Sequence, residues 1–217
     1  MIKLLGELPH KVTIACSGGS DSMSLLNFCR VGKRDIQVLY VHHKTEHGAD
    51  AYNFIRNYCV KNNLPFITRE IGNVKAKGES EEEYWRNERY KIIESEASSD
   101  RKVLLAHHLD DVIETWIMSS FHGKPTIIPY MYKNKNPNII RPFLQTSKEE
   151  IIYYIERNKV EYIHDESNDE LHHARNRIRH MIVPEALKIN PGIHKVVRKK
   201  VLENFQNSGS ETDAVIS

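Results

Sequence analysis

The fold of this 217-residue chain is decided by the stretch Val12-Thr13-Ile14-Ala15-Cys16-Ser17-Gly18-Gly19-Ser20-Asp21-Ser22. Its first five residues form an apolar run with the length and β-branched content of a buried strand. Beyond Asp21, the apolar residues Leu25, Leu26 and Cys29 recur at helical spacing. Between them lies a turn with two adjacent glycines and three hydroxyl side chains. The stretch therefore predicts a strand, a tight turn and a helix in succession.

The same alternation of short apolar runs and longer amphipathic stretches continues through the first two thirds of the chain. It is typical of strand-helix-strand units around a parallel sheet. We predict strands over Val12 to Cys16, Gln37 to His42, Pro65 to Ile71 and Val103 to His107. We predict helices after Asp21, over Ala51 to Lys61, from Ser80 to Ala97 and over Leu109 to Phe121. The third of these helices begins with a capping box formed by Ser80 and Glu83. The predicted fold class is α/β, a doubly wound parallel sheet with a small helical C-terminal extension.

Three regions are predicted along the chain. Residues 1–135 form the α/β domain, and residues 136–206 form a helical, basic extension. Near this boundary, His122 to Asn138 is rich in Gly, Pro, Lys and Asn and is predicted to be a loop. A short run, Ile139 to Leu144, and an amphipathic helix near Lys148 to Arg157 follow. Residues 207–217 are polar and are expected to be disordered.

The composition, with 40% hydrophobic and 28% charged residues, is that of a soluble globular protein and excludes disordered and fibrous chains. The residues before Pro9 are too few for a signal peptide or a membrane span, so we expect a cytoplasmic protein without membrane contact. Three cysteines, Cys16, Cys29 and Cys59, form no C-x-x-C pair, which disfavours disulfides and thiolate-bound zinc.

Positive charge is concentrated near the C-terminus. The formal net charge is only +2, but Leu171 to Lys200 holds eight Lys or Arg residues against one acid, Glu185. Such a block favours binding to phosphate groups, although a solvated helix face is the commoner explanation of a basic run. Nucleic acid is therefore a candidate partner that this segment alone does not decide.

The turn after the first strand has the composition of a phosphate cradle. Adjacent glycines let backbone amides approach an anion, hydroxyls add donors, and the following helix contributes the positive end of its dipole. The G-K-[ST] ending of a Walker loop is absent. Asp21 would repel a polyphosphate unless a divalent cation such as Mg²⁺ lay between them. The structural alternative is a tight Gly-Gly turn in which Ser20 or Asp21 caps the helix.

Ser17-Gly18-Gly19-Ser20-Asp21-Ser22 resembles the signature loop of the PP-loop ATP pyrophosphatases. This group cleaves ATP between its α- and β-phosphates and leaves AMP on a substrate oxygen. The resemblance implies a sheet of the adenine nucleotide alpha hydrolase type, with ATP and Mg²⁺ as cofactors. It also implies that the nucleotide is bound by Ser17, Gly18, Gly19, Ser20, Asp21 and Ser22 and, at the end of the second strand, by His42.

Two predicted helices carry further motifs. Ala106 to Thr115 looks like the segment A-x-H-L-D-D-x-x-E-T, in which Asp111 and Glu114 share a helix face near the carboxyl ends of the strands. Arg86 to Tyr90 is similar to the R-x-x-R-Y end of another helix of the group, whose arginines would clamp phosphate. Structural alternatives stay open, because acids in a first helical turn stabilise the dipole and Glu82 could pair with Arg86.

The segments after residue 140 narrow the resemblance to one family. Arg141-Pro142-Phe143-Leu144, Asp165-Glu166-Ser167-Asn168 and Arg175-Asn176-Arg177-Ile178-Arg179 with Pro184 resemble the R-P-L-L, D-x-S-N and R-N-x-[IL]-R … P motifs of the tRNA(Ile)-lysidine synthetases. Val41-His42-His43 matches the strand end that this family places next to adenosine. The motifs run in order over residues 10 to 185.

The resemblance implies an enzyme that adenylates the wobble cytidine of tRNA(Ile) and then joins free L-lysine to it. The implied catalytic residues are Asp21, Asp111, Glu114, Arg86 and Arg177, of which Asp21 and Asp111 would bind the metal. The implied RNA contacts are Arg175, Arg177, Arg179, Lys195, Arg198, Lys199 and Lys200. Contacts of this kind position RNA without choosing one tRNA among many. The oligomeric state stays open, a homodimer included.

Two departures from the family pattern keep rival hypotheses open. Ser119 to Pro125 replaces a Gly-rich R-G-S-G-x-x-G-L stretch, and the C-terminal tRNA-binding domains of bacterial members have no counterpart, so we expect a short form. One rival is a PP-loop tRNA base thiolase, which generally needs paired cysteines. The other is a non-catalytic ATP- and RNA-binding module that has kept the fold.

Overall fold

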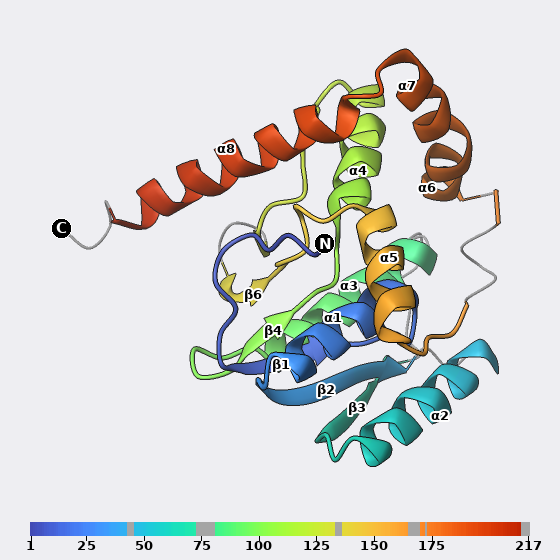
Figure 1. Ribbon diagram of the computed structural model, residues 1–217, viewed down its shortest axis with the longest axis vertical. Coiled ribbons are helices and arrows are strands. Elements are labelled where there is room, and N and C mark those ends of the chain that lie inside the picture. Colours follow the sequence, from blue (N-terminus) through green and yellow to red (C-terminus); the bar gives the residue numbers. More distant parts are fainter. Residues whose placement is uncertain (43–45, 73–80, 133–135, 165–169, 172, 214–217) are drawn as a thin grey trace.

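A six-stranded, mostly parallel sheet forms the centre of the molecule (Figure 1). The computed structural model describes the whole chain except residues 43–45, 73–80, 133–135, 165–169, 172 and 214–217. Its strands are β1 (Lys11–Ala15), β2 (Asp35–His42), β3 (Phe66–Glu70), β4 (Lys102–Leu104), β5 (Met131–Tyr132) and β6 (Asn136–Ile140), in the spatial order β3-β2-β1-β4-β6-β5. Only β5 runs antiparallel to its described neighbour. The direction of winding reverses between β1 and β4, where ligands of open α/β sheets bind.

Helices cover both faces of the sheet and build a second core beside it. They are α1 (Ser20–Val31), α2 (Glu46–Lys61), α3 (Glu81–Ser95), α4 (Leu109–Phe121), α5 (Lys148–Asn158), α6 (Ala174–Arg177), α7 (Val183–Ile189) and α8 (Ile193–Asp213), with a π-helical turn, Ile178–Ile182, between α6 and α7. One face of the sheet packs against α1, α2 and α5, and the other packs against α3. The apolar faces of α4, α7 and α8 form the second core, where α8 crosses α4 (Figure 1).

The predicted α/β fold with a doubly wound parallel sheet is confirmed. The first three predicted strands match β1, β2 and β3 to within two residues at each end. The fourth was predicted over Val103 to His107, but β4 ends at Leu104. The chain leaves the ladder after Leu105, whose N–H donates to the carbonyl oxygen of Ile140, because it must turn into α4 within three residues. The predicted capping serine, Ser80, lies outside the described residues.

The segment predicted as a loop, His122 to Asn138, contains β5 and the start of β6, so that prediction was wrong. β6 pairs with β4 through Val103↔Ile139 and Leu104↔Ile140, and only those two isoleucines of β6 are buried. A strand whose first residues are Asn, Pro and Asn carries too little apolar alternation to be recognised from the sequence. β6 therefore belongs to the same sheet as β1 and β4, although it begins after residue 135, where the α/β domain was predicted to end.

The tail predicted to be disordered, residues 207–217, is helical as far as Asp213. α8 is anchored by its buried residues Val197 and Val201, and extending an existing helix adds one hydrogen bond per residue without a new nucleation cost. The Ser208 hydroxyl also donates to the carbonyl oxygen of Asn204. Among the described residues, no helix is both long and apolar enough to cross a membrane.

Candidate active site

The glycine-rich turn between β1 and α1 is held by hydrogen bonds between its own residues and by one from Ile163. Gly18 adopts a φ of +87°, which favours glycine, and its carbonyl oxygen accepts from the N–H of Ile163 at 3.0 Å. The buried hydroxyl of Ser22 accepts from Ser17 N at 3.2 Å and donates to Gly19 O at 3.1 Å. Ser22, predicted to bind the nucleotide, therefore shapes the turn from within.

The N-terminus of α1 leaves amide groups available at this turn. Gly19 is the N-cap residue, and no side chain in the described part of the chain makes a capping hydrogen bond, so Ser20 and Asp21 do not have the capping role that the structural alternative gave them. The first N–H groups of a helix have no partner within the helix, and the helix dipole places partial positive charge there. Backbone donors without a side-chain cap are what an anion-binding turn requires.

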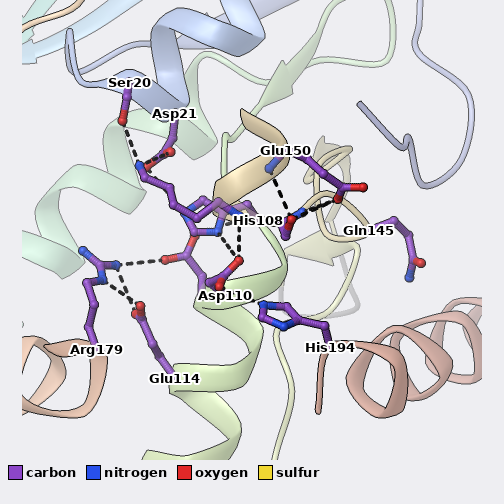
Figure 2. Close-up of polar contacts among 12 residues, drawn as sticks. Ser20, Asp21, His108, Asp110, Glu114, Gln145, Glu150, Arg179 and His194 are labelled. Carbon is purple, nitrogen blue, oxygen red and sulfur yellow. Dashed lines mark hydrogen bonds and ion pairs between the residues drawn. The ribbon is translucent and has the colours of Figure 1, made fainter. Parts of the chain in front are cut away.

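A lysine from a distant helix reaches the same turn. Lys148, the first residue of α5, places its Nζ 2.8 Å from Ser20 Oγ and 2.5 Å from Asp21 Oδ1 (Figure 2). The loop lacks the in-line lysine of a Walker motif, and Lys148 brings the equivalent charge from elsewhere in the chain. The Asp21 side chain is 35% exposed, so it remains open to solvent beside this lysine.

A buried histidine lies between the two carboxylates predicted to bind metal. His108 Nε2 is 3.6 Å from Asp21 Oδ2 and 3.6 Å from Asp111 Oδ2. Burial on its own lowers the pKa of His108, but the carboxylates of Asp111, Asp21 and Asp110 outweigh it and raise the pKa above the usual value. Burial likewise raises the pKa of Asp111, but His108 and Arg175 bring it well below the usual value. The structure thus brings Asp21 and Asp111 to one ionised cluster.

Glu114 is saturated by two arginines. Its side chain is 2% exposed and accepts from Arg175 Nε at 2.9 Å and from Arg179 Nε at 2.7 Å. Asp111 Oδ1 accepts from Arg175 Nη2 at 2.9 Å and lies 3.4 Å from Arg179 Nη2. Among the described residues, the Nη1 group of each arginine makes no hydrogen bond. Glu114 therefore fixes the two arginines in the site, and their Nη1 groups are free for an anion.

The remaining predicted residues are not all in this cluster. Arg177 is exposed on α6, and none of its contacts with described residues reaches Asp111 or Glu114. Arg86 is exposed on α3, with its guanidinium carbon 5.5 Å from the ring centre of Tyr90. His42 lies at the end of β2, where its buried Nδ1 has no partner among the described residues. Asp165 to Asn168 and the Glu82 side chain lie outside the described residues.

Three of the four predicted RNA-binding residues of α8 lie on its surface. Lys195, Lys199 and Lys200 are exposed, and Lys200 Nζ lies 5.6 Å from the ring centre of Trp116. Arg198 points inward instead and donates to Glu150 Oε2 at 2.6 Å. Arg175 and Arg179, also predicted to bind RNA, are engaged with Glu114. The exposed basic face of α8 therefore consists of the three lysines.

Sequence reasoning missed Lys148, and missed His108 as a member of the site. A signal existed for Lys148, because a lysine at the first position of a helix is unfavourable beside the positive end of the dipole. The contact itself could not be predicted, since Lys148 and Ser20 are 128 residues apart. His108 belonged to a recognised motif beside His107, and only the structure shows that His108 is the one whose Nε2 lies 3.6 Å from both Asp21 Oδ2 and Asp111 Oδ2.

Comparison with known proteins shows the family of the chain. The family model that describes the PP-loop domain matches residues 3–186. The bifunctional protein TilS/HprT of Listeria monocytogenes serotype 4b is 35% identical over 214 residues, covering 90% of this chain and 33% of that protein. The tRNA(Ile)-lysidine synthase of Francisella tularensis subsp. tularensis is 28% identical over 230 residues, covering 96% of this chain and 58% of that protein. The chain thus spans between a third and three fifths of the length of these curated relatives.

Among solved structures, an NH3-dependent NAD synthetase from Campylobacter jejuni is similar in fold. It aligns with a TM-score of 0.57 over 93% of this chain and 86% of that chain, at 12% sequence identity. At this identity the likeness concerns the fold alone.

Proposed function

The chain belongs to the PP-loop domain family, and from this premise we propose that it acts as a tRNA(Ile)-lysidine synthase. Enzymes of the PP-loop ATP pyrophosphatase type use ATP. The observation that carries the proposal is the convergence of Lys148 and Asp21 on the glycine-rich turn, with Asp111 across His108. The phosphates of a nucleoside triphosphate need a cationic side chain and free helix amides, and their metal counterion needs carboxylates.

The phosphates would lie against the N-terminus of α1. The turn itself would supply three donors, the backbone amides of Gly19 and Ser20 and the hydroxyl of Ser17. The Lys148 ammonium group would move a short distance, from Asp21 to a phosphate oxygen. Such preorganised donors stabilise charge that builds on the phosphates during transfer, without reorganisation at the moment of reaction. Arg175 and Arg179 would use their free Nη1 groups on the α-phosphate or on the departing diphosphate.

Asp21 and Asp111 suit a magnesium ion. Carboxylate oxygens are the ligands that Mg²⁺ prefers, and this ion usually takes only one or two from protein, with phosphates and water completing the shell. Both carboxylates already face positively charged side chains, Asp21 that of Lys148 and Asp111 that of Arg175, and the His108 imidazole lies 3.6 Å from each carboxylate. Bound there, Mg²⁺ would neutralise phosphate charge and polarise the α-phosphate.

The reaction would proceed in two displacements. The C2 oxygen of the wobble cytidine forms a bond to the α-phosphorus, and the bond to the β-phosphate oxygen breaks, releasing diphosphate. The ε-amine of free lysine then bonds to C2, AMP leaves with the oxygen, and the amine loses a proton. The role of the protein is to orient the three reactants and to keep the ionised cluster in place.

The exposed lysines of α8 would hold the RNA. Lys195, Lys199 and Lys200 lie on one helix that packs against α4, the helix that carries Asp111. Phosphate contacts of this kind supply affinity and orientation. With tRNA as its substrate, the protein would work in the cytoplasm.

Nothing in the described residues favours the thiolase. Cys16, Cys29 and Cys59 are free and at most 3% exposed. Burial raises the pKa of Cys29 and of Cys59 to about 12, so neither supplies the thiolate that sulfur transfer needs.

One experiment tests the proposal as a whole. The protein is incubated with ATP, Mg²⁺, bulk tRNA and labelled lysine, and both AMP release and transfer of label to RNA are followed. We expect AMP and labelled RNA to form together, and each to require the other substrates. AMP release that does not depend on lysine, or label that never reaches RNA, would contradict the lysidine synthase assignment.

A further inference from the structure

The helix with the exposed lysines and the helix with Lys148 meet at one carboxylate. Asp110 Oδ2 accepts from the backbone N–H of Lys148 at 2.7 Å, and Asp110 Oδ1 lies 3.0 Å from His194 Nε2. A single side chain on α4 thus uses one oxygen for the first residue of α5 and the other for the first turn of α8. Figure 2 shows Asp110 and His194 side by side, next to His108.

A second polar contact joins α8 to the same end of α5. Arg198 Nη2 donates to Glu150 Oε2 at 2.6 Å, and Arg198 Nε donates to Gln145 O at 3.0 Å. Gln145 Nε2 in turn donates to Arg198 O at 3.2 Å. Glu150 also accepts from Ser147 N, completing the capping box of α5. The N-terminal turn of α5 is therefore tied twice to α8.

These contacts are polar, and the joint is not closely packed. The apolar side of α8 packs against α4 through Ile193, Val197 and Val201. Between α8 and the start of α5 lies a half-open pocket of about 430 Å³, whose lining includes Asp110, Glu150, His194 and Arg198. The buried apolar residues of α5 and α8 belong to different clusters, so among the described residues these hydrogen bonds are the contacts through which a change at α8 can reach α5.

Lys148 connects this joint to the phosphate loop. Its backbone N–H is held by Asp110, and its side chain holds Ser20 and Asp21. Asp110 touches neither residue of the loop in the described contacts. Whatever fixes Asp110 therefore fixes the helix end from which Lys148 reaches the loop.

We propose that Asp110 is a positioning residue that couples α8 to the phosphate loop through Lys148, so that RNA on the lysines of α8 and ATP at the loop strengthen each other's binding. The inference rests on the proposed function. RNA that holds α8 in place restricts His194, Asp110 and the first turn of α5, so less conformational entropy is lost when Lys148 binds phosphate. Thermodynamic linkage makes the effect equal in both directions.

The test measures the dissociation constant of the α,β-methylene analogue of ATP, with Mg²⁺, in the absence and presence of saturating tRNA. For the wild-type chain we expect tRNA to tighten the analogue at least about fivefold, the lower end of typical allosteric coupling. The coupling is expressed as the ratio of the dissociation constant without tRNA to that with tRNA. In His194→Ala this ratio should fall to about one, because the hydrogen bond to Asp110 is lost. His194→Gln, whose amide can still donate to Asp110, should restore it. Glu203→Gln, on the exposed side of α8, should keep the wild-type ratio.

A second readout does not depend on nucleotide. Exchange of the Lys148 amide hydrogen, which is bonded to Asp110, should slow when tRNA binds the wild-type chain and should not respond to tRNA in Asp110→Asn or His194→Ala. A merely structural role for Asp110 would change the exchange rate without making it respond to RNA. This measurement also serves if one of the two variants folds poorly.

The outcomes separate this inference from the proposed function. A wild-type ratio of one, with ATP analogue and tRNA both bound, would overturn the coupling and leave the enzyme assignment standing. A wild-type ratio retained in His194→Ala would overturn the role of Asp110. Wild-type protein that binds no ATP analogue at all would overturn the proposed function and the coupling with it.

Discussion

Lys148 and Asp21 are 127 residues apart in the chain, and Lys148 Nζ lies 2.5 Å from Asp21 Oδ1. The contact places a positive charge on a turn that has none of its own. It also pairs the carboxylate that is proposed to bind metal with an ammonium group. Under the proposed function, binding of ATP with its cation would exchange these partners: Lys148 would move to a phosphate, and Asp21 would become available to the ion.

Lys148→Met should show separately whether Lys148 binds phosphate and whether it competes with the metal ion for Asp21. Loss of a hydrogen bond from a charged donor costs about 1.5–3 kcal/mol, so ATP affinity measured by calorimetry should fall by roughly ten- to a hundredfold. Mn²⁺ alone, followed by electron paramagnetic resonance, should bind more tightly, because the competing ammonium is gone. Lys148→Arg should retain most of the ATP affinity, and Lys61→Met on α2 should change neither. Unchanged ATP affinity in Lys148→Met would show that Lys148 does not contact phosphate.

Asp21→Asn should remove catalysis and spare the fold. The side chain is 35% exposed and its ion pair with Lys148 is partly solvated, so the free energy of unfolding should change by no more than about 1 kcal/mol. AMP formation should fall on the order of a hundredfold or more, as when one preorganised electrostatic group is lost. Chemical denaturation and AMP release are measured on the same preparation. A variant that keeps its rate would remove Asp21 from the metal site.

Glu114→Gln should be destabilising. Glu114 is 2% exposed and accepts from both Arg175 and Arg179, so its neutralisation leaves two guanidinium groups with Asp111 as their shared counter-charge. Breaking a buried pair by removing one partner costs about 3–5 kcal/mol. Arg177→Ala, which alters an exposed residue of α6 in the same motif, should leave the urea midpoint almost unchanged. Equal midpoints for Glu114→Gln and wild type would contradict the saturated cluster.

Acid sensitivity should depend on His107. Burial, the main cause, lowers the pKa of His107 from 6.5 to about 3. Below pH 6.5 the unfolded chain therefore binds a proton that the folded chain refuses, and stability falls with decreasing pH by up to about 1.4 kcal/mol per unit. His108, whose pKa is raised, acts above that range, where its stabilising effect is lost as pH rises. Urea unfolding at pH 6.5 and 5.0 should show a smaller difference in His107→Asn than in wild type and in His122→Asn.

The α8 lysines should set the salt dependence of RNA binding. Replacing Lys195, Lys199 and Lys200 together by Gln should weaken tRNA binding and reduce the slope of log affinity against log salt by about 2–3, since each phosphate contact contributes roughly 0.7–0.9. ATP affinity without RNA should stay at the wild-type value. The matched control replaces three exposed lysines outside α8, Lys33, Lys61 and Lys91. An equal loss in both triple variants would mean that tRNA responds to net charge alone.

The sequence was informative where a local pattern carries the information. The β1 strand, the turn and α1 form one continuous stretch, so their succession was predicted. The hydrophobic periodicity of α4 runs from Leu109 to Phe121, and both of its bounds were predicted. The pair β5 and β6 was missed because its stability comes from pairing with β4, which leaves little alternation in Asn136 to Ile140. Tertiary hydrogen bonding outweighed local propensity there.

The site was predictable in its residue types but not in their partners. Asp111 and Glu114 were expected one helical turn apart, and that spacing is present in α4. Their arginines come from a segment some sixty residues further on, and the sequence could not show that Arg175 and Arg179, two positions either side of Arg177, would point inward while Arg177 stays exposed. A spacing of four on a helix indicates a shared face but not which face is buried.

The bond from Ile163 N to Gly18 O has a consequence for the order in which the protein is made. A ribosome completes β1, α1 and most of the sheet long before it adds Ile163. Until then the glycine-rich turn lacks the side chain of Ile163, which packs against Gly18. A Cβ atom added to Gly18 would lie 3.0 Å from Ile163 Cδ1. Contacts between residues so distant in sequence form late, so we expect the nascent chain to pass through a stage with a formed sheet and an unfinished turn. Nucleotide affinity should therefore be acquired only when translation has passed this isoleucine.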